Sequence, residues 1–479
     1  MVGIVRNVNY GMGMMRTLLT VDRLPGVVVA LLSGVALLFL LNPPAAWSPN
    51  EARTAALVIF VIALWATNLL PEYITALLFF LLAMLFMLAP AEVLFSGFRT
   101  TAFWLILSGL IIGVAISTTG LGVRIAGWTA RRLRGGYGTV IASLTGLGVG
   151  FGFLMPSAMG RVILLVPIAV AIAEHFGFGR GSNGRRGIVL AMVLGSFIPT
   201  FAVLTANVPN LVLAGMSESN YGIVFLYGEY LLLHFPVLGF VKAVVIALLI
   251  IRLFPDTLKP SVSTALNTDN LRSRQQYILG ALLLVLVALW VSDAVHGISP
   301  AWIALGGAIF LMLPGVAIVS QKQFNEKVNY ASLLFVAAIL GLGSVVAHSG
   351  LGGRFAAVVM SELPLDGETP FINYLLISAT SMVTGLFTTL PGVPAVMTPI
   401  TNDLAYATGF SNQSILHMQV VGFSTMLFPY QAPPVVVGMQ LAGEQGRDAI
   451  KVCVLLAIVT LVVLVPLNYL WWSGLGRLA

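Results

Sequence analysis

The sequence predicts an all-α polytopic membrane protein with about eleven transmembrane helices, two re-entrant hairpins and an inverted-topology repeat. Three observations lead to this class. The 479 residues are 58% hydrophobic and only 9% charged, whereas a soluble chain carries about a quarter charged residues. Apolar runs of about 18 to 25 residues, long enough to cross a bilayer, recur along the chain. Landmarks of the first half also return, in the same order, in the second half.

Each apolar run of this length is predicted to be a transmembrane helix. The runs lie at residues 25–42, 53–70, 73–90, 101–120, 187–215, 235–253, 275–293, 301–319, 331–350, 414–440 and 451–472. Two further apolar stretches, 138–175 and 371–408, are interrupted by MPSAMGR and TTLPGVP, where Pro and Gly stop a continuous helix. Each is expected to form a re-entrant hairpin. The aromatic-rich stretch 221–235 either lies at the outer membrane interface or extends the next span.

The basic residues predict the orientation in the cell membrane. The net charge is +7 and, with the N-terminus inside, 18 of the 24 Lys and Arg residues fall in cytoplasmic loops. Because such loops collect Lys and Arg, residues 1–24 are expected to form a cytoplasmic N-terminal segment. This distribution records topology, so no nucleic-acid partner is expected. Arg161 and Lys242 fall instead within membrane segments.

The internal repeat rests on three pairs of matching segments. GVAISTTGLGVRIA at 113–126 matches GSVVAHSGLGGRFA at 343–356 in glycine spacing and in the Arg after each GLG. The hairpin cores then align on Pro167 and Pro399, and TANVPNLVLAGM and QAPPVVVGM align on Pro209 and Pro434. Basic residues follow the first GLGxR copy and acidic residues the second, which places the copies on opposite sides of the membrane.

Inverted repeats with interrupted helices are typical of secondary transporters, whose substrate site lies near the midplane where the interrupted elements meet. Half-helix N-termini at such a site favour an anion. The chain has one cysteine, Cys453, and neither an HExxH or GxSxG motif nor a carboxylate cluster in the predicted spans. A membrane-embedded enzyme is therefore a weaker hypothesis than a transporter, and no cofactor is expected. A passive anion channel is the other alternative, because channels also use re-entrant loops.

Four segments carry a family resemblance. They are LWATNLLPEYITALLFFLLAMLF at 64–86, FWLILSGLIIGVAISTTGLGVRIA at 103–126, NVPNLVLAG at 207–215 and APPVVVGM at 432–439. In order and spacing they resemble the divalent anion/sodium symporter (DASS) family over residues 55–475. The resemblance implies eleven spans and two hairpins, a homodimer, and a transport domain that moves across a scaffold domain by an elevator-like step. It also implies di- and tricarboxylates or related organic acids as substrates, with sulfate as a further candidate.

The same resemblance divides the chain into segments. Residues 25–100 are expected to be scaffold helices, and 101–220 the first repeat of the transport domain, with hairpin 138–175. Residues 221–330 are expected to supply an interface helix and scaffold helices. Residues 331–479 form the second repeat, with hairpin 371–408.

Family members place a Ser-Asn-Thr motif at each hairpin tip, where it touches the substrate and helps to bind sodium. The corresponding residues here are Ser157-Ala158-Met159 and Thr389-Leu390-Pro391. Both tips lack the Asn amide, which removes a side-chain oxygen from each cation site and puts sodium coupling in doubt, leaving a proton or counter-substrate as alternatives. The apolar tip residues favour a less charged or more hydrophobic carboxylate than the usual dicarboxylates.

Arg161 follows the first tip, and we expect its guanidinium to grip the substrate carboxylate and partly to replace the charge of a bound cation. The alternative is an Arg that snorkels or faces the scaffold. The remaining predicted substrate contacts, which come from the two interrupted spans, are Asn207, Asn210, Pro433 and Pro434. The candidate cation ligands are Ser157, Thr205, Asn207, Thr389 and Gln431. The alternative for the Asn and Gln side chains is interhelical hydrogen bonding.

The stretch GLGVGFGFL at 146–154 is glycine-rich but precedes no strand–helix unit, so it is not a nucleotide loop. Tight helix packing explains it better. Together these observations predict a secondary active transporter for small anions, embedded in lipid as a multi-pass protein.

Overall fold

The computed structural model describes residues 24–44, 46–67, 69–132, 135–258 and 274–478. These residues are helical and contain no strand, and ten of their helical stretches are long and apolar enough to cross a membrane. The predicted all-α class is therefore confirmed. The N-terminal segment, predicted to be cytoplasmic, lies outside the described residues except for Leu24.

Two groups of helices precede the two halves of the repeat. The first group comprises α2 Leu24–Leu41, α3 Pro49–Thr67, α4 Glu72–Leu85, α5 Ala91–Leu94 and the 3₁₀ turn η1 Ser96–Arg99. The second comprises α14 Arg274–Val291, α15 Asp293–His296, α16 Pro300–Met312 and α17 Gln321–Lys327.

The helices of the repeat itself correspond one by one. The first copy contains α6 Thr101–Thr119, α7 Leu121–Arg132, α8 Tyr137–Leu154, α9 Ala158–His175, α10 Asn183–Phe197, η2 Pro199–Ala202, α11 Val208–Tyr221, and α12 Tyr227–His234 continued by η3 Phe235–Val241 and α13 Lys242–Leu253. The second contains α18 Tyr330–Ser349, α19 Leu351–Glu362, α20 Pro370–Thr388, α21 Gly392–Met397 with η4 Thr398–Ile400 and α22 Thr401–Thr408, α23 Asn412–Phe423, η5 Pro429–Gln431, α24 Pro433–Ala442, and α25 Gly446–Val459 continued by η6 Thr460–Leu464 and α26 Val465–Gly474. The last helix of each copy contains a π-helical turn, η3 in one and η6 in the other.

The GLGxR motif forms the same turn in both copies. Gly120 ends α6 with φ 68°, and Gly350 ends α18 with φ 81°. A residue without Cβ adopts this left-handed conformation at little cost, and it is the usual way to end a helix. The repeated letters therefore encode a repeated change of helix direction, from α6 to α7 and from α18 to α19.

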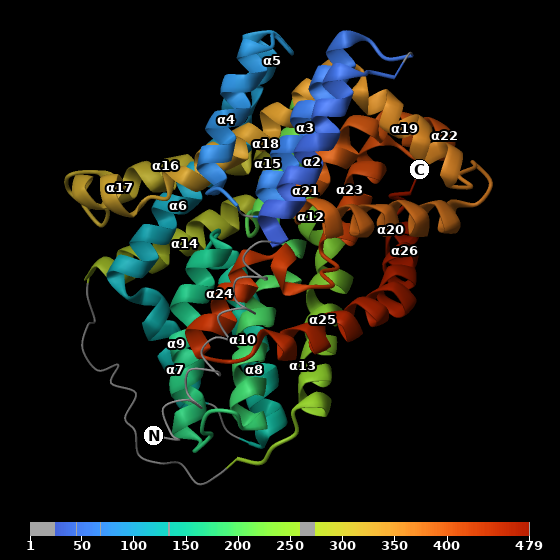
Figure 1. Cartoon of the computed structure of the whole chain (residues 1–479). Helices are drawn as coiled ribbons and strands as arrows, with labels where there is room; N and C mark the ends of the chain where they lie inside the picture. The colour runs from blue at the N-terminus through green and yellow to red at the C-terminus, as the bar shows by residue number, and fades with distance from the viewer. Residues whose placement is uncertain (1–23, 45, 68, 133–134, 259–273, 479) are drawn as a thin grey trace, which may run out of the picture.

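Helix packing shows which neighbours surround the segment that follows the first repeat and the first helix of each copy. Residues 227–253 form one continuous helix, so the aromatic-rich stretch extends the following span, and this helix packs on α8, α10 and α25. It thus lies beside helices of both hairpin-containing halves (Figure 1), within the segment predicted to supply an interface helix and scaffold helices. Helices α6 and α18 pack on α16 and α4 respectively, and both also pack on α11.

The glycine-rich stretch of α8 lies against α10 at backbone contact. A Cβ added at Gly148 would lie 2.6 Å from the backbone N of Ser196, and one added at Gly195 would lie 2.9 Å from Cα of Thr145. Side chains at these positions would therefore force the two helices apart. This contact agrees with the tight packing that the small residues predicted, and it fixes α10 beside the first hairpin.

We expect Gly148→Ala to destabilise the protein, because the new methyl group would meet backbone atoms of α10 that cannot move alone. Overpacking of this kind costs about 1–3 kcal/mol. The matched control is Gly146→Ala, because a Cβ there has no atom within 4 Å and alanine favours the helix. Thermal unfolding in detergent measures both, and equal melting temperatures for the two variants would contradict the tight crossing.

Candidate functional site

The tip of the first hairpin is a short non-helical turn between α8 and α9. Ser157 is the N-cap of α9, and its Oγ accepts a hydrogen bond from the N–H of Gly160 at 3.1 Å. Pro156 lies against α6, since a Cβ added at Gly109 would lie 2.8 Å from the Cβ of Pro156. The tip is therefore held on one side by its own cap and on the other by a glycine of α6.

The tip of the second hairpin is more strained. Thr389 has φ 72° and ψ 163°, a conformation that residues with a side chain rarely adopt. The N–H of Leu390 donates to the carbonyl of Gln431 at 3.5 Å, and that of Gly392 donates to the carbonyl of Thr389 at 3.2 Å. These two N–H groups of the tip therefore donate to its own turn and to the loop before α24.

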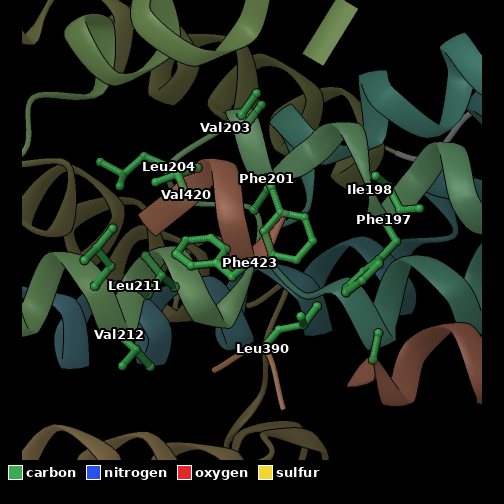
Figure 2. Packing of buried hydrophobic residues seen from close by; sticks show 14 of the residues in the cluster. Phe197, Ile198, Phe201, Val203, Leu204, Leu211, Val212, Leu390, Val420 and Phe423 are labelled. Carbon is green, nitrogen blue, oxygen red and sulfur yellow. The ribbon is translucent and has the colours of Figure 1, made fainter. Parts of the chain in front are cut away.

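Both interrupted spans are broken as predicted. Between α10 and α11 the chain forms the turn η2 and then leaves the helix until Val208, and between α23 and α24 it is non-helical apart from η5. The two breaks meet in the core, where the rings of Phe201 and Phe423 lie 5.6 Å apart between centroids (Figure 2). Tyr230 of α12 also donates its hydroxyl to the carbonyl of Phe201 at 3.0 Å.

Arg161 connects the first tip to the first break and is completely buried. Its five N–H groups donate to the carbonyls of Met155, Ser196 and Ala206, the hydroxyl of Thr200 and Oδ1 of Asn207, at 2.6 to 3.1 Å. These bonds use every donor of the guanidinium. No donor of Arg161 therefore remains for a substrate in this conformation, and Arg161 does not line the cavity described below. A direct grip on the substrate stays a prediction that these bonds do not support.

In the second copy a neutral side chain joins the hairpin to the break, and it comes from the break itself, not from the hairpin. Gln431 donates from Nε2 to the carbonyl of Gly385 in α20 at 2.8 Å. Its Oε1 accepts the N–H groups of Leu427 and Phe428, each at 2.9 Å. Gln431 therefore ties the second break to the second hairpin, as Arg161 ties the first, but without a charge.

A cavity of about 820 Å³ lies where tips and breaks meet. The predicted site residues that line it are Ser157, Ala158, Met159, Leu390, Pro391, Asn207, Gln431, Pro433 and Pro434. Four predicted residues do not line it: Arg161, Thr389, Thr205 and Asn210.

The amide side chains of the first break hold the loop together. Asn210 donates from Nδ2 to the carbonyls of Phe201 and Val203. Asn207 reaches the cavity wall, but its Oδ1 accepts from Arg161 and its Nδ2 donates to Thr200 and Phe197. Both side chains therefore make hydrogen bonds within the protein, and those of Asn210 stay within the break itself instead of joining two helices.

The cavity has lining residues that the sequence analysis missed. They come mainly from α6, as Leu110, Gly113 and Ser117 do, and from α9, while α18 adds Ser332 and Phe335. Gly109 and Gly113, spaced by four on α6, were the available signal, because small residues at this spacing mark a close helix contact. Thr200, which bonds both Arg161 and Asn207, carried no signal in an apolar run.

Comparison with known proteins agrees with this architecture. Residues 25–478 match the family model described as the sodium:sulfate symporter transmembrane region. The chain belongs to this family. Membership confirms the predicted DASS relationship and a transporter, not an enzyme, with many membrane-spanning helices.

Individual relatives are distant. The chain is 22% identical over 477 residues to dicarboxylate transporter 2 of spinach chloroplasts, which covers 92% of this chain and 81% of that protein. It is 23% identical over 454 residues to an uncharacterized transporter of Haemophilus influenzae, covering 91% and 95% of the two chains. The fold resembles that of the YdaH transporter of Alcanivorax borkumensis, with a TM-score of 0.53 and 18% identity over 82% of this chain and 89% of that chain.

Removal of the Arg161 side chain should destabilise this symporter-family protein, because Arg161→Ala leaves buried acceptors without donors, at about 1–3 kcal/mol for each. Arg161→Lys should recover only part of the loss, since an ammonium has three donors and no planar fork. Thermal unfolding in detergent measures the effect, with exposed Arg180→Ala as the control. Arg161→Ala with wild-type stability would show that the five bonds do not hold the tip.

Proposed function

We propose that the protein is a secondary active transporter that carries small anions by alternating access. The observation that supports this proposal most strongly is that two hairpin tips and two broken helices, one of each from each copy of the repeat, line one cavity. Di- and tricarboxylates or related organic acids are the expected substrates, with sulfate as a further candidate. The name of one relative, the spinach dicarboxylate transporter, supports this class.

The moving part would be the body that contains the hairpins and breaks. The cavity is also lined by α4, α6, α17 and α18, which pack with the predicted scaffold helices. An elevator-like step would carry the tips past these helices, within a homodimer in the lipid bilayer whose N-termini face the cytoplasm. A passive channel is the second candidate, but two tips of different sequence fit alternating access better than a symmetric pore.

The oxygens around Arg161 bear on whether a sodium ion is needed for coupling. Unwound carbonyls and half-helix C-terminal ends are the groups that hold coupling cations in secondary transporters. Here such oxygens, from Met155, Ser196 and Ala206, are all occupied by the guanidinium. We therefore expect the fixed charge of Arg161 to act in place of a sodium ion at the first tip.

A fixed charge also favours exchange over symport. A charge within a membrane is costly unless it is compensated, and none of the five acceptors of Arg161 is a carboxylate. A bound anion would compensate this charge, so the loaded transport domain should cross the membrane more readily than the empty one.

Proteoliposomes that contain the full chain test both points. We expect uptake of a labelled carboxylate without sodium on either side, and faster uptake when the vesicles are preloaded with unlabelled carboxylate. The assay uses succinate, citrate and sulfate with sodium, proton or counter-substrate gradients imposed one at a time. Strict dependence on sodium would contradict the role given to Arg161, and a lack of gradient-driven movement of any anion would contradict the proposed function.

A further inference from the structure

The two copies of the repeat contribute different groups to the cavity wall: the first supplies free N–H donors, and the second does not. Among the residues that the structure describes, the N–H groups of Ala158, Met159 and Val208 have no hydrogen-bond acceptor, and all three residues line the cavity. Ala158 and Met159 begin α9, and Val208 begins α11, so these are the donors that a helix N-terminus leaves unpaired. Ser157 adds a hydroxyl group at the same tip.

Arg161 holds these two N-termini together and adds a charge behind them. It donates to Met155 at 2.6 Å and to Asn207 at 3.0 Å, and both acceptor residues line the cavity. The guanidinium of Arg161 is therefore separated from the cavity only by the residues to which it is hydrogen-bonded. An anion at the free donors is stabilised by this charge and by the dipoles of both helices.

The matching part of the second copy offers no such donor. Pro433 and Pro434 are the first two residues of α24, and Pro391 precedes α21, so all three lack an N–H group. The N–H groups of Leu390 and Ala432 are taken by the carbonyls of Gln431 and Pro429. This part of the wall is therefore apolar and without charge.

No other charged residue named here gives the second copy's part of the cavity wall a charge comparable to that of Arg161. Lys242 is buried, but it donates to the carbonyl and hydroxyl of Ser424 at 2.9 and 3.3 Å, and neither residue lines the cavity. The charged residues that do line it are Glu72 and Lys327, which come from α4 and α17, and Lys327 is exposed to solvent.

We infer that the substrate of this cavity is an amphipathic monocarboxylate, with its carboxylate on the donors of Ser157, Ala158, Met159 and Val208 and its apolar body along Leu390 and the prolines of the second copy. The inference rests on the proposed function and narrows its substrate class. A second carboxylate placed on the second copy would lie against Leu390 and the prolines, which offer it no donor, and a desolvated charge is costly there.

Binding measurements on the full chain in detergent distinguish one carboxylate from two. Isothermal titration calorimetry compares pairs in which one member has a second carboxylate: hexanoate with adipate, octanoate with suberate, and 3-phenylpropanoate with its para-carboxylated analogue. We expect the monocarboxylate of at least one pair to bind tenfold or more tightly than its partner, and hexanamide not to bind. The inference is wrong if no monocarboxylate exceeds its partner. If neither these anions nor succinate, citrate and sulfate bind or are transported, the proposed function itself fails.

Single proline substitutions test the placement of the carboxylate. Ala158→Pro removes one free N–H at the first position of α9, where proline is well tolerated, and Ser157 before it is already extended, with φ −89° and ψ 110°. We expect the monocarboxylate to bind roughly tenfold more weakly, because hydrogen bonds to charged groups are strong, with the melting temperature unchanged.

The converse substitution, Pro433→Val, gives α24 the N–H that Val208 gives α11, and it should strengthen dicarboxylate binding in particular. Pro370→Val, at the exposed start of α20 outside the cavity, is the control and should change neither affinity. Wild-type affinity for monocarboxylates in a stable Ala158→Pro protein would show that the carboxylate does not bind at this tip.

Discussion

The guanidinium of Arg161 is the interaction on which the candidate site depends. A buried charge is tolerated only where it is fully hydrogen-bonded, and Arg161 meets this condition with five acceptors from the first tip, the end of α10, η2 and the loop before α11. Each acceptor must stay in place as long as the charge is there. The same bonds therefore fix the tip of α8–α9 and the N-terminus of α11 relative to each other.

In the second copy the hairpin is joined to the broken helix by a neutral side chain. This side chain is that of Gln431, which bonds the carbonyl of Gly385, while α24 begins with Pro433 and Pro434. The two copies thus share an order of helices but not a chemistry. An inverted repeat permits this difference, because the cavity needs both tips in place but does not need both to carry a charge.

Much of the fold was predictable because its signals are local. Apolar runs located most of the long helices, Gly120 and Gly350 aligned the two copies, and Pro and Gly marked the breaks. The partners of Arg161 were not predictable, because Ser196 and Asn207 lie 35 and 46 positions away in the sequence. Local patterns place a side chain on a helix, but packing decides which groups it meets. For the same reason the contact between Gly148 and Gly195 was foreseen only as tight packing without a partner.

The charge of Arg161 and the apolar residues of the cavity wall act together on a ligand. Electrostatic interactions are stronger where water and polar groups are few, so the field of Arg161 is weakly screened in a cavity lined by residues such as Leu110, Leu390 and Phe335. One carboxylate gains from this field and from the free N–H groups of α9 and α11. A second carboxylate against the second copy would lose its water without gaining a donor there, so this apolar part of the wall opposes a second charge.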